Sequence, residues 1–297
     1  MIDKIGFIGL GAMGNKMVPF LLKAGYEVFV SDLDRKVVAD MVALGAVACE
    51  SATQVADSAE VVLACLPTPD VVLSVALGEN GVVHGTRVRV FVDHSTSGTV
   101  LARQVAVALA ERGIQALDAP LAGGVAGATA GTLSVMAGGD KQAFDRCEPV
   151  FQAFGKNVVH VGADAGMGQA LKLVNNMIVA STLVATAEAV LMGVKAGLSA
   201  KVMVDMLNVS TARSFASETL IGKCVLSRRF DMGFRMDLMR KDIRLFLAEA
   251  EAHGTPACTS AVVKQFFDQA LTSGDPSRDM THVVRFLEQL AQVDVAY

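Results

Sequence analysis

The sequence predicts an α/β domain with a doubly wound sheet over residues 1–165, followed by an all-helical domain over residues 166–297. Two observations support this division. Before residue 165, short apolar runs alternate with helical patterns, as in a parallel sheet with helices on both faces. After it no strand pattern occurs, and residues 169–196 form one long apolar interdomain helix.

The expected strands each end in a polar or glycine-containing loop. They are predicted at residues 5–10, 27–31, 60–66, 88–92 and 114–117, with Asp34 capping a helix over 35–44. In the second domain, helices are predicted at 199–208, 215–227, 236–253, 258–273 and 279–293. Ligands of open α/β sheets bind beyond the carboxyl ends of the strands. We therefore expect the loops 67–70, 93–97 and 118–124 to line one crevice.

A glycine-rich turn follows the first predicted strand and precedes a predicted helix. Its sequence is Gly9-Leu10-Gly11-Ala12-Met13-Gly14. Gly9 allows a tight turn, Gly11 lets the backbone approach a pyrophosphate, and Gly14 lets the helix pack against the strand. The free N–H groups at the start of the helix would then face the phosphates. The segment is a candidate cofactor-binding turn of Rossmann type, and a structural glycine turn is the alternative.

Asp32 ends the second strand, where it can accept hydrogen bonds from the hydroxyls of an adenosine ribose. A 2′-phosphate would meet this carboxylate, so the expected cofactor is NAD. Arg35 lies close by in the sequence and could soften the preference, which leaves NADP open.

Composition excludes several classes of protein. The net charge is −4 and no stretch is rich in arginine or lysine, so nucleic acid is not an expected partner. The five cysteines form no CxxC pair and the five histidines form no HExxH motif, which indicates reduced thiols in a cytoplasm and no metal site. Glycines interrupt the apolar run at the N-terminus, so no targeting segment is expected.

The chain is unusually apolar, with 52% hydrophobic residues and a mean hydropathy of +0.46. We expect part of its apolar surface to be covered in a homodimer or homotetramer, with the C-terminal domains in contact. No membrane partner is expected, because Asn175, Asn176 and Glu188 interrupt the long apolar helix.

Lys172 lies in the first turns of that helix, and Asn176 follows one turn later on the same face. The helix dipole disfavours a cation at this end, and partial burial disfavours it further, so both effects favour a neutral amine that can exchange protons. Lys172 is therefore the candidate acid–base residue. The alternative is a lysine whose charged end reaches out of an apolar helix into water.

Five spaced motifs extend over nearly the whole chain. They are Gly9-Leu10-Gly11-Ala12-Met13-Gly14, Asp118-Ala119-Pro120-x-x-Gly123-Gly124, Gly131-Thr132-Leu133, Gly166-x-Gly168-x-x-x-Lys172-x-x-Asn175-Asn176 and Lys241-Asp242-Ile243. In this order they resemble the motif set of the β-hydroxyacid dehydrogenases. That family includes 3-hydroxyisobutyrate dehydrogenase, tartronate semialdehyde reductase and 2-(hydroxymethyl)glutarate dehydrogenase.

The resemblance implies a nucleotide-binding N-terminal domain, a helical C-terminal domain and an active site in the cleft between them. By position, Lys172 would be the catalytic lysine and Asn176 would help to hold the substrate. Ser95 and Thr96 would lie beside the nicotinamide and the substrate.

The resemblance also places residues along the cofactor. Leu66 and Pro67 would lie beside it, and Lys241 would reach back to close over it. A solvated helix face is the alternative for Lys241, since Arg240 and Arg244 beside it would suit that role equally well.

One departure from the family pattern concerns the substrate. The family usually has serine where this chain has Ala122, and that hydroxyl helps to hold the substrate carboxylate. Backbone N–H groups of Gly123 and Gly124 can still form an anion pocket. Arg213 could clamp a second, distal carboxylate, because it lies in a polar break where the family places cleft-facing residues. A helix-capping turn with a solvated arginine is the alternative for Arg213.

The sequence therefore predicts a cytoplasmic NAD-dependent oxidoreductase that interconverts a short β-hydroxy acid and its semialdehyde. Lys172 would donate the proton to the forming alkoxide in reduction and take it in oxidation. A reductase of imines or small aldehydes is one alternative, which Ala122 would permit. A non-catalytic NAD-binding sensor is the other, and the pair of Lys172 and Asn176 argues against it.

Overall fold

The computed structural model describes residues 2–272 and 274–296 and divides the chain into two compact units. The first unit runs to Lys172 and the second begins at Leu173. The division falls inside helix α8 (Met167–Lys195), which is continuous through both units.

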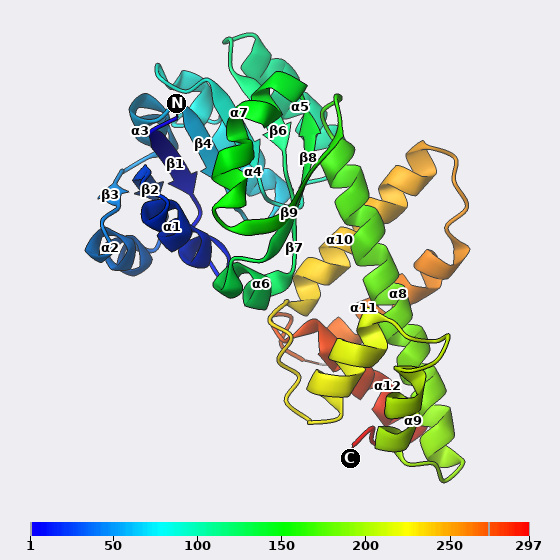
Figure 1. The fold of residues 1–297 in the computed structure, drawn as a ribbon. Helices are drawn as coiled ribbons and strands as arrows, with labels where there is room; N and C mark the ends of the chain where they lie inside the picture. Colours follow the sequence, from blue (N-terminus) through cyan, green and yellow to red (C-terminus); the bar gives the residue numbers. More distant parts are fainter. Residues whose placement is uncertain (1, 273, 297) are drawn as a thin grey trace. The chain divides into compact units, whose positions relative to one another are not determined.

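The first unit is built on a sheet with the strand order β3-β2-β1-β4-β5-β6-β8-β7, and β9 pairs with β8 (Figure 1). The strands are β1 (Lys4–Ile8), β2 (Glu27–Ser31), β3 (Val47–Ala48), β4 (Val61–Ala64), β5 (Val90–Asp93), β6 (Gln115–Asp118), β7 (Leu121–Ala122), β8 (Leu133–Gly139) and β9 (Gly155–Gly162). From β3 to β6 all neighbouring strands are parallel, which confirms the predicted doubly wound arrangement. β8 runs antiparallel to β6 and β7, a reversal that the sequence did not predict.

Helices cover both faces of this sheet (Figure 1). They are α1 (Gly14–Lys23), α2 (Arg35–Ala43), α3 (Ala52–Ser58), α4 (Pro69–Leu77), η1 (Val82–His84), α5 (Thr99–Ala110), α6 (Gly124–Ala130) and α7 (Lys141–Gln152). Residues within one strand alternate between two buried clusters, as Val28 and Val30 do against Phe29. Because successive side chains point to opposite faces, a strand buried on both faces reads as a continuous apolar run.

Two predicted loops were partly wrong. The predicted loop 67–70 ends at Thr68, because the Thr68 hydroxyl accepts from the Val71 N–H and Pro69 begins α4. The predicted loop 118–124 contains the short strand β7, and α6 begins at Gly124. The predicted cap at Asp34 is confirmed, since its carboxylate accepts from the Lys36 N–H.

The second unit is helical throughout its described residues, as predicted, apart from one isolated bridge between Arg235 and Asp279. Besides α8 it contains α9 (Ala200–Leu207), the π-helix η2 (Ala216–Val225), α10 (Met236–Ala252), α11 (Cys258–Thr272), η3 (Met280–His282) and α12 (Val283–Ala291). Residue 273, the predicted end of α11, lies outside the described residues.

By length and composition α8 could cross a membrane, with a mean hydropathy of 1.9 in its most apolar window. However, 44% of that window is buried within the protein. Met177, Leu183, Val184 and Leu191 pack in the core of the second unit. Buried core helices pass the same compositional test, and these contacts fit such a helix.

Candidate functional site

The glycine turn after β1 leaves open space at its centre. Gly9 has φ +92°, and a Cβ on Gly14 would lie 2.0 Å from the Gly9 oxygen, so a side chain at either position would be strained or would clash. At Gly11, by contrast, an added Cβ would meet no atom within 4 Å. The turn is therefore closely packed on the protein side and open at Gly11, where a ligand can approach the backbone.

The carboxylate of Asp32 is hydrogen-bonded to the backbone of this turn. Its Oδ2 accepts from the Leu10 N–H at 2.6 Å, and its Oδ1 accepts from the Asp34 N–H at 2.8 Å. Arg35, 91% exposed, reaches toward Glu50 at 3.8 Å. The structure thus brings Asp32 to the glycine turn, and the lone pairs that remain on its oxygens can accept from a ribose.

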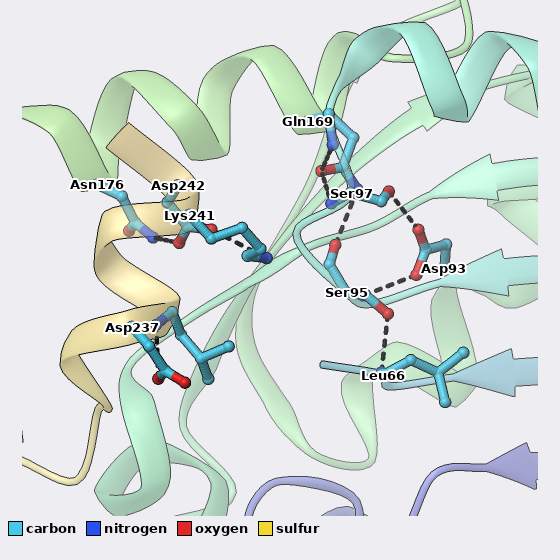
Figure 2. A network of polar contacts seen from close by, with 11 residues as sticks. Leu66, Asp93, Ser95, Ser97, Gln169, Asn176, Asp237, Lys241 and Asp242 are labelled. Carbon is cyan, nitrogen blue, oxygen red and sulfur yellow. Dashed lines mark hydrogen bonds and ion pairs between the residues drawn. The ribbon is translucent and has the colours of Figure 1, made fainter. Parts of the chain in front are cut away.

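Asp93, at the end of β5, orders the loop that follows (Figure 2). One carboxylate oxygen accepts from the Ser95 N–H at 2.8 Å and the other accepts from the Ser97 hydroxyl at 2.6 Å. The Ser95 hydroxyl oxygen accepts from the Leu66 N–H at 2.8 Å, which joins two predicted site segments. Ser95 is buried and fixed within the first unit.

Gln169, in the first turn of α8, is 0% exposed and binds the same loop (Figure 2). Its Oε1 accepts from the Ser97 N–H at 2.9 Å and from the Gly98 N–H at 3.2 Å. Its Nε2 donates to the Ser95 carbonyl at 2.9 Å. All three bonds go to main-chain atoms, so they depend on the course of the loop.

Asp118, at the end of β6, also holds the first turn of α8. Its Oδ1 accepts from the Gly166 N–H at 2.7 Å and its Oδ2 accepts from the Gln169 N–H at 2.8 Å. Burial raises the pKa of the Asp118 carboxyl to about 6, although these two hydrogen bonds act in the opposite direction. Packing here is backbone to backbone, since a Cβ on Gly168 would lie 2.2 Å from the Met136 oxygen.

His94 is buried between the loops after β5 and β6. Its Nδ1 lies 2.7 Å from the Ala119 carbonyl, so Nδ1 must carry the proton and donate it. The rings of Phe151 and Phe154 meet the imidazole edge-on, each at 5.6 Å between centroids. Burial lowers the pKa of His94 to about 4, and the hydrogen bond to Ala119 offsets part of that effect. The imidazole is therefore neutral at physiological pH.

The segment predicted to form an anion pocket has a backbone that suits only glycine. Gly123 has φ +124° and Gly124 has φ +62° where α6 begins, and Ala122 pairs with Ser134 in the sheet. A side chain at Gly123 would also approach Leu133 to 3.2 Å.

In the second unit, a buried carboxylate joins Asn176 and Lys241 (Figure 2). Asp242 is 2% exposed; its Oδ2 accepts from Asn176 Nδ2 at 2.6 Å, and its Oδ1 pairs with the Lys241 ammonium at 3.1 Å. Asn175 Nδ2 donates to Asn176 Oδ1 at 3.0 Å. These contacts hold Asn176 and Lys241 in defined positions, and the charge of Asp242 is paired.

Arg213 lies in the turn between α9 and η2, with its side chain 65% exposed. Its Nε donates to Glu218 Oε1 at 2.6 Å, in the first turn of η2. Lys172 is partly buried, three residues after Gln169 and four before Asn176 along α8. Among the described residues, no group of three or more His, Cys, Asp or Glu side chains could hold a metal ion.

Sequence reasoning missed the ordering roles of Asp93, His94, Asp118, Gln169 and Asp242. Asp93 and Asp118 could have been suspected, because each is an acidic residue at the end of a buried strand. Gln169 and His94 carry no such signal, since a single glutamine or histidine is uninformative until its partners are known.

Comparison with known proteins matches both halves of the chain. A family model for the NAD binding domain of 6-phosphogluconate dehydrogenase matches residues 4–162. A second, described as NAD-binding of NADP-dependent 3-hydroxyisobutyrate dehydrogenase, matches residues 166–287.

Individual relatives match over almost their full length. The chain is 38% identical to 2-(hydroxymethyl)glutarate dehydrogenase of Eubacterium barkeri, over 99% of this chain and 97% of that protein. It is 34% identical to 2-hydroxy-3-oxopropionate reductase of Escherichia coli, over 99% of this chain and 100% of that protein. The structure of 3-hydroxyisobutyrate dehydrogenase from Mycobacterium tuberculosis with L-serine is 32% identical, with a TM-score of 0.87 over 97% of this chain and 99% of that one.

Proposed function

Because this chain belongs to the β-hydroxyacid dehydrogenase family, we propose that Lys172 is the residue that exchanges the proton in its reaction. The protein is an NAD(P)-dependent oxidoreductase that acts on the CH–OH group of a short β-hydroxy acid. The bound nicotinamide accepts the hydride in oxidation and supplies it in reduction of the semialdehyde. The known relatives favour this reaction over imine reduction or a sensor without turnover.

The residues present fit a dinucleotide cofactor. The open space at Gly11 and the N–H groups at the start of α1 suit a pyrophosphate. Asp32 suits a ribose with free hydroxyls, which supports a preference for NAD over NADP. Leu66, Pro67, Thr96 and Lys241 are proposed as further cofactor contacts, together with Gly9, Leu10, Ala12, Met13 and Gly14 of the turn.

In this proposal, Lys172 donates a proton to the forming alkoxide in reduction and removes it in oxidation. One observation carries the proposal: the first turn of α8, three residues before Lys172, is hydrogen-bonded through Gln169 to the loop containing Ser95 and Thr96. A lysine fixed in this way can meet a substrate held by that loop.

The substrate carboxylate is proposed to bind the N–H groups of Gly123 and Gly124, beside Ala122. Asn176 is proposed to hold the substrate as well. Its Nδ2 has a second hydrogen besides the one that it donates to Asp242, so one donor remains for a ligand.

The function is tested by following oxidation of NADH and of NADPH with a panel of semialdehydes, glyoxylate and cyclic imines. We expect turnover of semialdehydes that carry a carboxylate, and a higher kcat/KM with NADH than with NADPH. Turnover of imines alone, or binding of NADH with no turnover of any compound, would contradict the proposed function. A higher kcat/KM with NADPH would contradict the role of Asp32.

Arg213 is proposed to favour substrates that carry a second, distal carboxylate. Its planar guanidinium can bind a carboxylate through two N–H groups, and its exposed ion pair with Glu218 is weak enough to be replaced. Arg213→Met should therefore remove most of the preference for a dicarboxylate semialdehyde, while turnover of the monocarboxylate analogue changes little.

The control for Arg213 is Arg229→Met, because Arg229 is 62% exposed and pairs in the same way with Asp231 in the same unit. This variant should keep the wild-type preference. Equal losses on both substrates in Arg213→Met, or no loss on either, would return Arg213 to a capping role.

We also propose a cytoplasmic homodimer or homotetramer assembled through the second unit. Four exposed apolar side chains follow one another on and beside α9: Leu198, Val202, Met206 and Val209, each more than half exposed. A second copy covering this face would remove it from water. Light scattering on the purified protein should give a multiple of 31.1 kDa. A monomer at all concentrations would contradict the assembly.

A further inference from the structure

Gln169 connects the helix that carries Lys172 to the loop that carries Ser95. Its amide oxygen accepts from the Ser97 and Gly98 N–H groups, and its amide nitrogen donates to the Ser95 carbonyl. No other standard side chain of this length offers one acceptor and one donor side by side without charge. The two N–H groups and the carbonyl of the loop therefore match the acceptor and the donor of the Gln169 amide.

The first turn of α8 is held at a second point by Asp118. That carboxylate accepts from the Gly166 and Gln169 N–H groups, so the turn is attached to the end of β6 as well as to the loop after β5. Attachment to two different segments opposes rotation of the turn about the helix axis. Lys172 follows Gln169 by three residues, which places both side chains on neighbouring parts of one face.

We propose that Gln169 is a positioning residue, which fixes Lys172 relative to the Ser95 loop so that the proton can pass between lysine and substrate. The inference rests on the proposed function, because it takes Lys172 as the acid–base residue. A displacement of about 1 Å at a reacting group can cost roughly 100-fold in rate. Loss of this amide is expected to act on kcat in this way.

The first test is Gln169→Met, which keeps the length of the side chain and removes all three hydrogen bonds. We expect kcat for semialdehyde reduction to fall roughly 10- to 100-fold. The dissociation constant of NADH should change by less than about threefold, because the hydrogen bonds of the Gln169 amide go to the Ser95 loop, whereas the glycine turn and Asp32 are held by their own hydrogen bond. A primary isotope effect on kcat with deuterated NADH should increase, since the chemical step becomes slower than product release.

The matched control is Ser97→Ala, which removes the hydroxyl bond to Asp93 in the same loop and leaves the Ser97 N–H free to donate to Gln169. It should lower thermal stability with a much smaller loss in kcat than Gln169→Met. If both variants lose kcat in proportion to their loss of stability, Gln169 has only a structural role and the inference fails.

A second variant, Gln169→Glu, tests the chemistry even if the methionine variant folds poorly. An ionised carboxylate at position 169 would still accept from the two N–H groups but would repel the Ser95 carbonyl. A protonated carboxyl can donate to that carbonyl and restores the pattern of the amide. Asp118, which accepts from the N–H of residue 169, and Asp93, which binds Ser97, disfavour ionisation of an added carboxyl, whereas the Lys172 ammonium three residues further along the helix favours it.

The ratio of kcat in Gln169→Glu to that of the wild type should therefore rise as pH falls. A ratio that is independent of pH, in a variant that is folded, would overturn the inference. Lys172→Ala separates the two claims. If that variant is inactive while Gln169→Met keeps wild-type kcat, the positioning role fails and the acid–base role of Lys172 stands. If Lys172→Ala stays active, the acid–base role of Lys172 fails.

Discussion

Lys172→Ala is expected to lower kcat by roughly 10²- to 10⁴-fold and to leave the dissociation constant of NADH nearly unchanged. That range is the usual contribution of a positioned general acid or base. The groups proposed to bind the cofactor are the glycine turn and Asp32, and Asp32 is held by the Leu10 N–H of that turn. Steady-state kinetics and fluorescence titration with NADH measure the two quantities.

The control for this variant is Lys195→Ala, at the other end of the same helix, where the side chain is exposed. It should keep wild-type kcat. If the Lys172 variant is folded and retains more than about a tenth of the activity, Lys172 is not the acid–base residue.

The second large effect concerns stability in acid. The pKa of His94 is lowered from 6.5 to about 4 in the folded protein, so the native state binds fewer protons than the unfolded state between these values. The contribution of neutral His94 to the free energy of unfolding is therefore fully present above about pH 6.5 and is lost as pH falls toward 4. The shift corresponds to roughly 3 kcal/mol of unfolding free energy.

Asp118 acts with the opposite sign in nearly the same window. Its folded pKa is raised from 3.8 to about 6, so protonation favours the folded protein as pH falls through this range. The wild-type pH profile alone would hide both effects. Comparison of the wild type with His94→Asn at each pH cancels the contribution of Asp118, and asparagine keeps an N–H that can donate to Ala119.

We expect the wild type to lose roughly 3 kcal/mol of stability relative to His94→Asn between about pH 7 and about pH 4. Urea unfolding at each pH gives the two free energies. The missing ring adds a constant cost to the variant, which does not change with pH. Parallel pH profiles of the two proteins would mean that His94 is accessible to water and charges normally.

Local signals predicted most of the fold. The bounds of β2 at Glu27–Ser31 and the cap at Asp34 depend on residues close together in the chain, and both are confirmed. The start of α4 was missed because Thr68 followed by Pro69 can form either a loop or a helix N-terminus. The pairing of β8 was missed because its partners β6 and β7 lie in other segments of the chain, and its own residues do not specify which strands it pairs with.

Contacts between residues far apart in the sequence were even harder to predict in the candidate site than in the fold. Lys172 and Asp32 were named because each follows a motif at a fixed spacing. Gln169 was not named, because its partners Ser95 and Asp118 are 74 and 51 residues away in the sequence. A glutamine acquires its role only when the loop after β5 and the end of β6 are folded around it.

The most direct test of the role of Lys172 is the pH dependence of kcat for oxidation of a β-hydroxy acid, in the wild type and in Lys172→Ala. A general base must be deprotonated, so wild-type kcat should fall at low pH, where the amine carries a proton. The residual rate of the alanine variant should lack this decline, since the group that titrates has been removed. The same decline in both proteins would show that another residue takes the proton, and it would contradict the assignment of Lys172.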